Sequence, residues 1–133
     1  MFEGTPVRRP LRIAMAGATG FVGTSLREAL RGRHEILGLT RSPHVPSLGA
    51  GRPNEIWRHC DLFSLRSVSE AMRGADVGIY LVHSMLPSSR LSQGRFEDFD
   101  LILADNFARA ARRHGLRQIL YIGGLVPDGD EAE

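Results

Sequence analysis

The sequence predicts an α/β domain in which helices cover a doubly wound parallel sheet of about five strands. Three observations carry this prediction. Short apolar runs alternate with stretches of helical spacing, glycines recur where helices should end, and neither a linker nor an internal repeat divides the 133 residues. The predicted domain covers residues 11–127, with an N-terminal tail at 1–10 and a C-terminal tail or truncation at 128–133.

The strands are predicted from short apolar runs of the kind found in buried parallel strands. The run Val77–Val82 is the most strand-like of them. Prolines and glycines predict a loop over 42–54, and polar residues predict another over 87–94. In chain order, the predicted strands are 11–16, 35–40, 55–60, 77–82 and 118–122.

Three stretches have the spacing of amphipathic helices, and each is followed by a glycine that suits a helix C-terminus. These glycines are Gly32, Gly74 and Gly115. Such crossovers between parallel strands are nearly always right-handed. The three predicted helices and their apolar positions are 19–31 (Val22, Leu26, Ala29, Leu30), 64–73 (Leu65, Val68, Met72) and 96–114 (Phe99, Leu103, Phe107, Ala110).

Composition excludes several function classes. The chain is 42% hydrophobic and 24% charged with a net charge of +2, which suits a globular domain and gives no argument for nucleic acid. No apolar run approaches the roughly 20 residues of a membrane span, and no signal peptide is evident, so we expect a cytoplasmic protein. The five histidines and the lone Cys60 predict no metal site, and Cys60 is expected to be a buried, inert thiol. All 17 basic residues are arginine, which excludes lysine chemistry within the chain.

The strongest chemical signal is a glycine loop after the first strand, with Gly17, Gly20 and Gly23 three residues apart. Gly17 allows a tight turn, Gly20 lets a pyrophosphate approach the backbone, and Gly23 lets the helix pack closely. The helix N-terminus offers N–H groups and a positive dipole to phosphates, and Thr19 adds a hydroxyl. The alternative is a glycine-rich turn without a ligand, but its place at the first strand–helix junction favours a cofactor site.

The end of the second strand indicates which dinucleotide binds. An acid about 20 residues beyond the loop would bind the ribose hydroxyl of NAD, whereas an arginine suits the 2′-phosphate of NADP. Here Thr40 is followed by Arg41 and Ser42, which favours NADP over NAD. The alternative for Arg41 is an ordinary surface arginine. Asp61, after the third strand, has two open interpretations: an acid facing the adenine, or an N-cap of the next helix.

These residues resemble the atypical short-chain dehydrogenase/reductase group, closest to its NmrA-like, NAD(P)H-binding branch of Rossmann domains. The resemblance covers roughly residues 11–127 and rests on Gly-Ala-Thr-Gly-Phe-Val-Gly (17–23), Thr-Arg-Ser (40–42), Cys-Asp-Leu (60–62), Tyr-Leu-Val-His-Ser-Met (80–85) and the runs 105–111 and 119–125.

The resemblance implies a role for each matching position. It implies that Asn106 ties its helix to neighbouring backbone. The residues implied around the cofactor are Gly17, Thr19, Gly20, Phe21, Val22 and Gly23 at the pyrophosphate, Arg41 and Ser42 at the 2′-phosphate, Asp61 and Leu62 at the adenine, and Val82, His83 and Ser84 near the nicotinamide-side ribose.

The sequence departs from catalytic members of that group. They use a serine after the fifth strand and a Tyr-x-x-x-Lys pair, in which the tyrosine exchanges a proton and the lysine lowers its pKa. Here glycines stand at the serine position, Tyr80 and Tyr121 lie inside predicted strands, and lysine is absent. His83 has a suitable pKa for acid–base work, but a lone histidine there is more often a contact or packing residue. We therefore name no catalytic residue.

Three hypotheses follow. The chain is the N-terminal half of an NADP(H)-dependent oxidoreductase that acts on an unnamed small molecule, or it is a redox sensor that holds NADP(H) without turnover. A third possibility is a truncated or pseudogene product with no stable fold, whose exposed sheet edges promote pairing with another chain, so that a homodimer completes the sheet.

Overall fold

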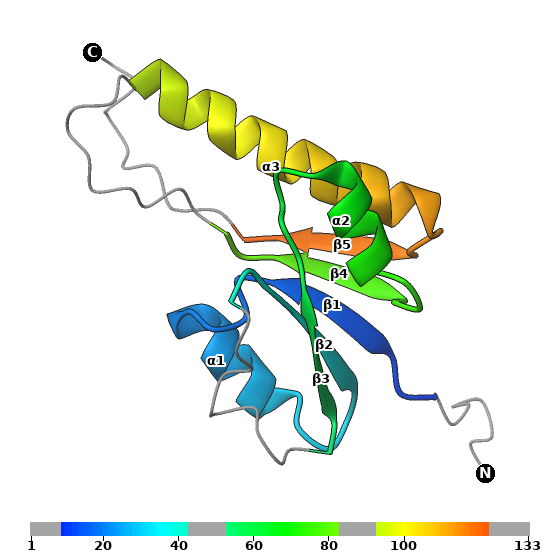
Figure 1. The fold of residues 1–133 in the computed structure, drawn as a ribbon. Helices are drawn as coiled ribbons and strands as arrows, with labels where there is room; N and C mark the ends of the chain where they lie inside the picture. Colours follow the sequence, from blue (N-terminus) through cyan, green and yellow to red (C-terminus); the bar gives the residue numbers. More distant parts are fainter. Residues whose placement is uncertain (1–8, 43–52, 83–92, 123–133) are drawn as a thin grey trace, which may run out of the picture.

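The predicted fold class is confirmed. The structure is a computed structural model that describes residues 9–42, 53–82 and 93–122, leaving aside the side chains of 93–99. Its five strands are all parallel and form one sheet in the order β3-β2-β1-β4-β5 (Figure 1). The elements are β1 (Arg12–Ala16), α1 (Phe21–Ala29), β2 (Glu35–Thr40), β3 (Glu55–His59), α2 (Leu65–Ala71), β4 (Val77–Tyr80), α3 (Gln93–Arg113) and β5 (Gln118–Tyr121).

The order of the strands places a crevice at the carboxyl end of the sheet. The chain moves outward from β1 to β2 and β3, then returns to the other side of β1 with β4 and β5. The helix that follows β1 and the helix that follows β4, α1 and α3, pack on opposite faces of the sheet. In open α/β sheets, ligands bind at this reversal point, beyond the carboxyl ends of the strands.

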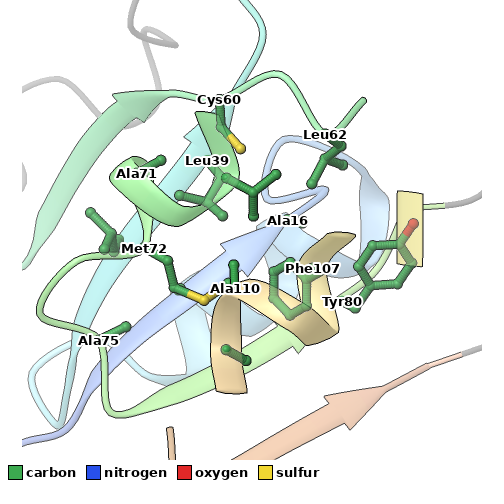
Figure 2. Packing of buried hydrophobic residues seen from close by; sticks show 14 of the residues in the cluster. Ala16, Leu39, Cys60, Leu62, Ala71, Met72, Ala75, Tyr80, Phe107 and Ala110 are labelled. Carbon is green, nitrogen blue, oxygen red and sulfur yellow. The ribbon is translucent and has the colours of Figure 1, made fainter. Parts of the chain in front are cut away.

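Alternation along the central strands divides the core into two layers. Ala14 and Ala16 face α2 and α3, while Ile13 and Met15 belong to the cluster on the α1 face. Figure 2 shows the first layer, where Phe107 of α3 packs against the ring of Tyr80 at 5.2 Å between centroids. The buried apolar positions predicted for the second and third helices are confirmed at Val68, Met72, Leu103, Phe107 and Ala110; Phe99 lies outside the described side chains.

The face that α1 buries differs in part from the predicted one. The apolar spacing pointed to Val22 and Ala29, yet both are exposed, and the fully buried positions are Gly23 and Arg27. The reason is the close approach of the helix to the glycine loop, which turns the Gly23 side inward. Leu26 and Leu30, the other two predicted positions, are half-buried and pack against the cluster on this face of the sheet, so the prediction holds for them.

Several element boundaries also differ. The third helix begins at Gln93 rather than Phe96, so the polar loop predicted over 87–94 is wrong at its end. The strands β3 and β4 end one and two residues earlier than predicted. The predicted glycine stops are confirmed, since Gly32, Gly74 and Gly115 all have positive φ angles that favour glycine.

The strand β5 forms an open edge of the sheet. Within the described ranges its one pairing partner is β4, and all four of its residues are exposed, including Tyr121 at 64%. Leu120 and Ile122 add apolar surface to the same edge. Among the residues described, no helix combines the length and apolar character needed to cross a membrane.

Candidate functional site

The candidate site is a pocket of about 310 Å³ at the carboxyl end of the sheet. It lies where the loops after β1, β2, β3 and β4 meet, which is the reversal point of the strand order. Its volume is at the lower end of the range for small-molecule sites. The lining residues are Gly17, Ala18, Thr19, Leu39, Thr40, Arg41, Ser42, Cys60, Leu62, Phe63, Val82 and Leu103.

The pocket brings together most of the regions that the sequence pointed to. Six of the thirteen predicted site residues line it directly, and His83 and Ser84 lie outside the described residues. The six are Gly17, Thr19, Arg41, Ser42, Leu62 and Val82; the other five, Gly20, Phe21, Val22, Gly23 and Asp61, adjoin it in sequence without lining it.

Gly17 makes the tight turn that the sequence required. Its φ is +85°, and a Cβ there would lie 3.0 Å from the backbone carbonyl carbon of Leu81. The N–H of Gly20 donates to the carbonyl of Gly17 at 3.2 Å, which closes the turn. A side chain at Gly17 is therefore excluded by both backbone conformation and space.

Gly20 and Gly23 have different roles. A Cβ on Gly23 would lie 2.5 Å from the Gly17 carbonyl oxygen and 2.7 Å from the backbone of Ala18. The helix thus packs against the loop itself, rather than simply against the sheet. At Gly20, by contrast, a Cβ would meet only the Gly17 oxygen at 3.6 Å, so the space beyond it is available to a ligand.

The N-terminus of α1 is suited to an anion. Its cap residue Gly20 is extended and supplies no side-chain hydrogen bond, and the first turn carries no acid. The first N–H groups of the helix therefore have no side-chain acceptor at the cap, and the helix dipole adds partial positive charge. Phe21 is 88% exposed and Val22 42% exposed, so their side chains do not fill the core.

The end of β2 adds a basic residue to the pocket. Arg41 and Ser42 line it and are exposed, and the Ser42 N–H donates to the Thr40 hydroxyl oxygen at 3.0 Å. No acidic residue is among the described residues that line the pocket. This end therefore has the charge that suits a phosphate group.

The interpretation of Asp61 as the N-cap of the next helix is wrong. Ser64 caps α2, because its hydroxyl accepts a hydrogen bond from the Ser67 N–H at 3.1 Å. Asp61 Oδ1 instead accepts from the Phe63 N–H at 3.0 Å, and the Asp61 N–H donates to the Ser67 hydroxyl oxygen. Asp61 thus shapes the turn that carries Leu62 into the pocket wall.

Asn106 has the role that the resemblance implied. Its side-chain amide on α3 donates to the Leu62 carbonyl at 2.8 Å. The hydrogen bond links the long helix to the loop after β3. Asn106 therefore positions the part of the pocket wall that Leu62 forms.

Cys60 is buried, as the sequence predicted, and its lack of reactivity stays a prediction. Its burial and then the nearby charge of Asp61 raise the pKa of the thiol to about 12. The thiolate is the reactive form, so a thiol that stays protonated at neutral pH is a poor nucleophile. Cys60 contributes shape to the pocket wall.

Tyr80 and Tyr121 lie inside strands, as predicted, and their rings stack at 5.7 Å. Burial, followed by the charges of Asp100 and Tyr121, raises the pKa of Tyr80 to about 12. A catalytic tyrosine would need the opposite shift. The described residues also contain no group of three or more His, Cys, Asp or Glu side chains that could hold a metal ion.

The fold and the pocket define a dinucleotide-binding α/β domain of the Rossmann type. The chain belongs to the NAD dependent epimerase/dehydratase family, whose profile matches residues 13–132. This assignment agrees with the wider expectation of a dehydrogenase-like Rossmann domain. The narrower NmrA-like branch stays a prediction.

Two curated relatives match most of the chain. The auxiliary protein GraX of Staphylococcus aureus is 28% identical, over 92% of this chain and 39% of its own length. A uronate dehydrogenase of Pseudomonas putida is 32% identical, over 83% of this chain and 39% of its own length. The chain therefore spans about two fifths of the length of these relatives.

Solved structures agree with the fold. A variant of uronate dehydrogenase from Agrobacterium tumefaciens in complex with NAD is 27% identical with a TM-score of 0.68, covering 87% of this chain and 42% of that one. A UDP-N-acetylglucosamine 4-epimerase from Bacillus cereus has a TM-score of 0.71 at 22% identity, covering 92% and 40%. The second likeness concerns the fold alone.

Sequence reasoning missed some of the pocket wall. Leu39, Phe63 and Leu103 line it without having been predicted. Leu39 was expected only as part of a strand and Leu103 only as an apolar helix position, and nothing in the spacing distinguishes a core leucine from one at a pocket. Phe63 follows Cys-Asp-Leu, and its position after a predicted strand end was the one available signal.

Proposed function

We propose that the pocket binds NADP(H), with the pyrophosphate at the N-terminus of α1 and the 2′-phosphate at the end of β2. The observation that carries the proposal is the placement of Arg41 and Ser42 in the same pocket wall as Gly17 and Thr19. A guanidinium can donate two parallel hydrogen bonds to a phosphate, and the Ser42 hydroxyl adds a donor.

The remaining predicted residues take the rest of the nucleotide. We assign the adenine to the wall formed by Leu62 beside Asp61, and the nicotinamide-side ribose to the segment Val82, His83 and Ser84. The adenine assignment is supported by the hydrogen bond that the Asn106 side-chain amide donates to the Leu62 carbonyl, which holds this part of the wall in place. Support for the second assignment is the place of Val82 in the pocket, directly after β4.

The favoured role is the cofactor domain of an oxidoreductase related to the NmrA-like branch, in which the bound nicotinamide would supply or accept the hydride. The 32% identity to uronate dehydrogenase supports a redox role. This chain carries no lysine, and both tyrosines lie within strands, so we assign it no acid–base residue. Other parts of a longer protein or a partner would supply the substrate pocket.

The second candidate is a module that senses the redox state of NADP(H) without turnover. The absence of lysine and the raised pKa of Tyr80 favour it for this chain taken alone. The similarity to GraX, which is described as an auxiliary protein, is in keeping with a role other than catalysis. We expect such a module to be cytoplasmic, where both redox forms of the nucleotide are available.

The first experiment is a titration of the purified chain with NADPH and NADH, followed by nicotinamide fluorescence at one salt concentration. We expect NADPH to bind at least about tenfold more tightly, a difference of about 1.4 kcal/mol. If the folded chain binds neither nucleotide, the glycine loop is only a turn and the proposal fails. Equal affinity would reject the NADP preference and retain the site.

A second experiment separates the two roles. An oxidoreductase should oxidise NADPH in the presence of some carbonyl or quinone compound, whereas a sensor should bind NADPH and NADP⁺ and turn over neither. Absorbance of the reduced nicotinamide over a panel of such compounds measures this directly. Turnover by the chain alone would exclude the sensor.

A further inference from the structure

We propose that Arg27 is a positioning residue that holds the glycine loop in its ligand-binding shape. The consequence for ligands rests on the proposed function, because it concerns the dinucleotide pyrophosphate. Arg27 lies on α1 and was not expected to be buried, yet its side chain is only 2% exposed. Burying a guanidinium is costly unless its hydrogen bonds are used.

The guanidinium of Arg27 reaches back to the glycine loop. Its Nε–H donates to the backbone carbonyl of Ala18 at 3.0 Å, between Gly17 and Thr19. Ala18 itself lines the pocket and is 1% exposed. Arg27 therefore bonds the loop from inside the fold, on the side away from solvent.

The orientation of this one carbonyl determines where the next N–H points. The peptide bond is planar and trans, so the Ala18 carbonyl and the Thr19 N–H lie in one plane and point in opposite directions. Because Arg27 holds the carbonyl inward, the Thr19 N–H is directed outward, and Thr19 is exposed and lines the pocket. The same bond thus presents a backbone donor to a bound anion.

Two residues of the edge strand β3 keep Arg27 in place. The Nη1 of Arg27 donates to both carboxylate oxygens of Glu55, at 3.1 and 3.3 Å, and the Glu55 side chain is fully buried. The guanidinium also lies over the Trp57 ring, 5.0 Å from its centroid. Gly38 on β2 makes room for that ring, since a Cβ there would overlap it.

The ion pair between Arg27 and Glu55 is better explained by the orientation that it gives to the guanidinium than by a contribution to the free energy of unfolding. Desolvation of a buried pair can exceed its Coulombic gain, and apolar residues of similar size often replace such pairs without loss of stability. Here the Nη2 of Arg27 has no hydrogen-bond partner among the described residues, so the pair is not fully compensated. A methionine at this position would fill the same space in the core. It has no N–H group, however, and so could not donate a hydrogen bond to the Ala18 carbonyl.

The test replaces the pair with apolar residues of similar length and measures three quantities on the full chain. The variant is Arg27→Met/Glu55→Met, compared with the single Arg27→Met and with Arg31→Met, which removes an exposed ion pair from the same region. The measurements are the affinities for NADPH and NADH, the denaturation midpoint, and the hydrogen-exchange rate of the Gly20 amide. That amide donates to the Gly17 carbonyl and reports the order of the loop without a ligand.

We expect the double variant to keep a denaturation midpoint close to that of the wild type, while NADPH and NADH both bind at least about tenfold more weakly. The ratio of the two affinities should not change, because the pyrophosphate is common to both nucleotides. Exchange of the Gly20 amide should rise at least about tenfold relative to the amide of Met72, the residue that follows α2, whose N–H donates to the Val68 carbonyl at 2.9 Å. Arg31→Met should change none of these.

Two outcomes would overturn the proposal. One is wild-type affinity and wild-type Gly20 exchange in the folded double variant. The other is affinity that follows the denaturation midpoint across all variants, as a purely structural role would require. If the wild type binds neither nucleotide, the proposed function fails, and Gly20 exchange alone then decides whether Arg27 orders the loop.

Discussion

The two ends of the pocket are built from different parts of the chain. At the α1 end, the surface offered to a ligand is backbone, and its shape follows from buried contacts around Gly17 and Gly23. At the β2 end, the surface is formed by the exposed side chains of Arg41 and Ser42, which fill no core space.

The difference implies that the two ends of the pocket have separate roles in binding. A side chain at Gly17 or Gly23 disturbs packing, and one at Gly20 occupies the approach to the helix N-terminus, so this end is expected to determine whether any dinucleotide binds at all. A change at the β2 end leaves the core intact, so this end is expected to determine which dinucleotide is preferred. Affinity is then tied to the fold, whereas selectivity depends on a side chain that is free to vary.

The largest expected effect is that of Gly23→Ala. The new Cβ would lie 2.5 Å from the Gly17 oxygen, and backbone atoms cannot yield as a flexible side chain can. Overpacking of this kind costs about 1–3 kcal/mol, and we expect the free energy of unfolding to fall by at least that much. Binding of both NADPH and NADH should be lost. Urea denaturation with nucleotide titration measures both effects.

Gly32→Ala is the matched control for that variant. Its positive φ of 80° imposes backbone strain, but a Cβ there meets nothing within 4 Å. It should lower stability by about 1 kcal/mol and leave nucleotide affinity unchanged. Unaltered binding in Gly23→Ala would contradict the close approach of α1 to the loop.

The next effect is that of Gly20→Ala, which separates binding from stability. The added Cβ meets only the Gly17 oxygen at 3.6 Å, and the φ of −76° suits alanine. Alanine caps a helix less well than glycine, which lowers stability, but it also restricts the unfolded chain, which raises stability. The free energy of unfolding should therefore stay within about 1 kcal/mol of the wild-type value. The Cβ occupies the approach of the pyrophosphate, and both nucleotides should bind at least about tenfold more weakly. Equal binding in wild type and variant would remove Gly20 from the site.

A smaller effect is expected for Arg41→Glu, and it should concern preference alone. Reversing the charge repels the 2′-phosphate, so the NADPH preference should fall by about tenfold or more while NADH affinity changes little. Stability should change by less than about 0.5 kcal/mol, as for other exposed positions. Arg33→Glu is the control, because Arg33 is exposed near the opposite end of β2. A similar loss of NADPH preference in Arg33→Glu would show that the overall charge of the chain, rather than the position of Arg41, determines the preference.

The smallest effect is expected at Cys60, which lines the pocket without reacting. With a pKa of about 12, the thiol stays protonated at about pH 8, so a charged alkylating reagent should neither modify it in the native state nor alter NADPH affinity. The raised pKa stabilises the fold below the ordinary thiol value of 9.0, and this contribution is lost as the pH rises toward 12. Alkylation of the folded chain at about pH 8, measured by mass spectrometry, would contradict the assignment.

The fold could be predicted well because its signals are local. Apolar runs of strand length, helical spacing and glycine stops each depend on neighbouring residues, and together they gave the strands and the glycine loop. The tight conformation of the loop was predictable as well, since Gly17 and Gly23 are required by contacts that any residue with a Cβ would violate.

The rest of the site depends on contacts that local pattern does not contain. Arg27 resembles any of 17 arginines until the fold brings Glu55 and Trp57 of a distant strand beside it. The N-cap interpretation of Asp61 failed for a similar reason, because Ser64 is a competing cap three residues later. Element ends were also misplaced, as at Gln93, where polarity suggested a loop.

The most direct test of these separate roles is a double-mutant cycle with Gly20→Ala and Arg41→Glu, measured by titration with NADPH and NADH. We expect Gly20→Ala to weaken the binding of both nucleotides by the same factor and Arg41→Glu to change only the ratio of the two affinities. The two effects should add in free energy within about 0.5 kcal/mol. The contrary result is a change of ratio caused by Gly20→Ala, or an equal loss of both nucleotides caused by Arg41→Glu. Either would show that the two ends of the pocket do not have separate roles.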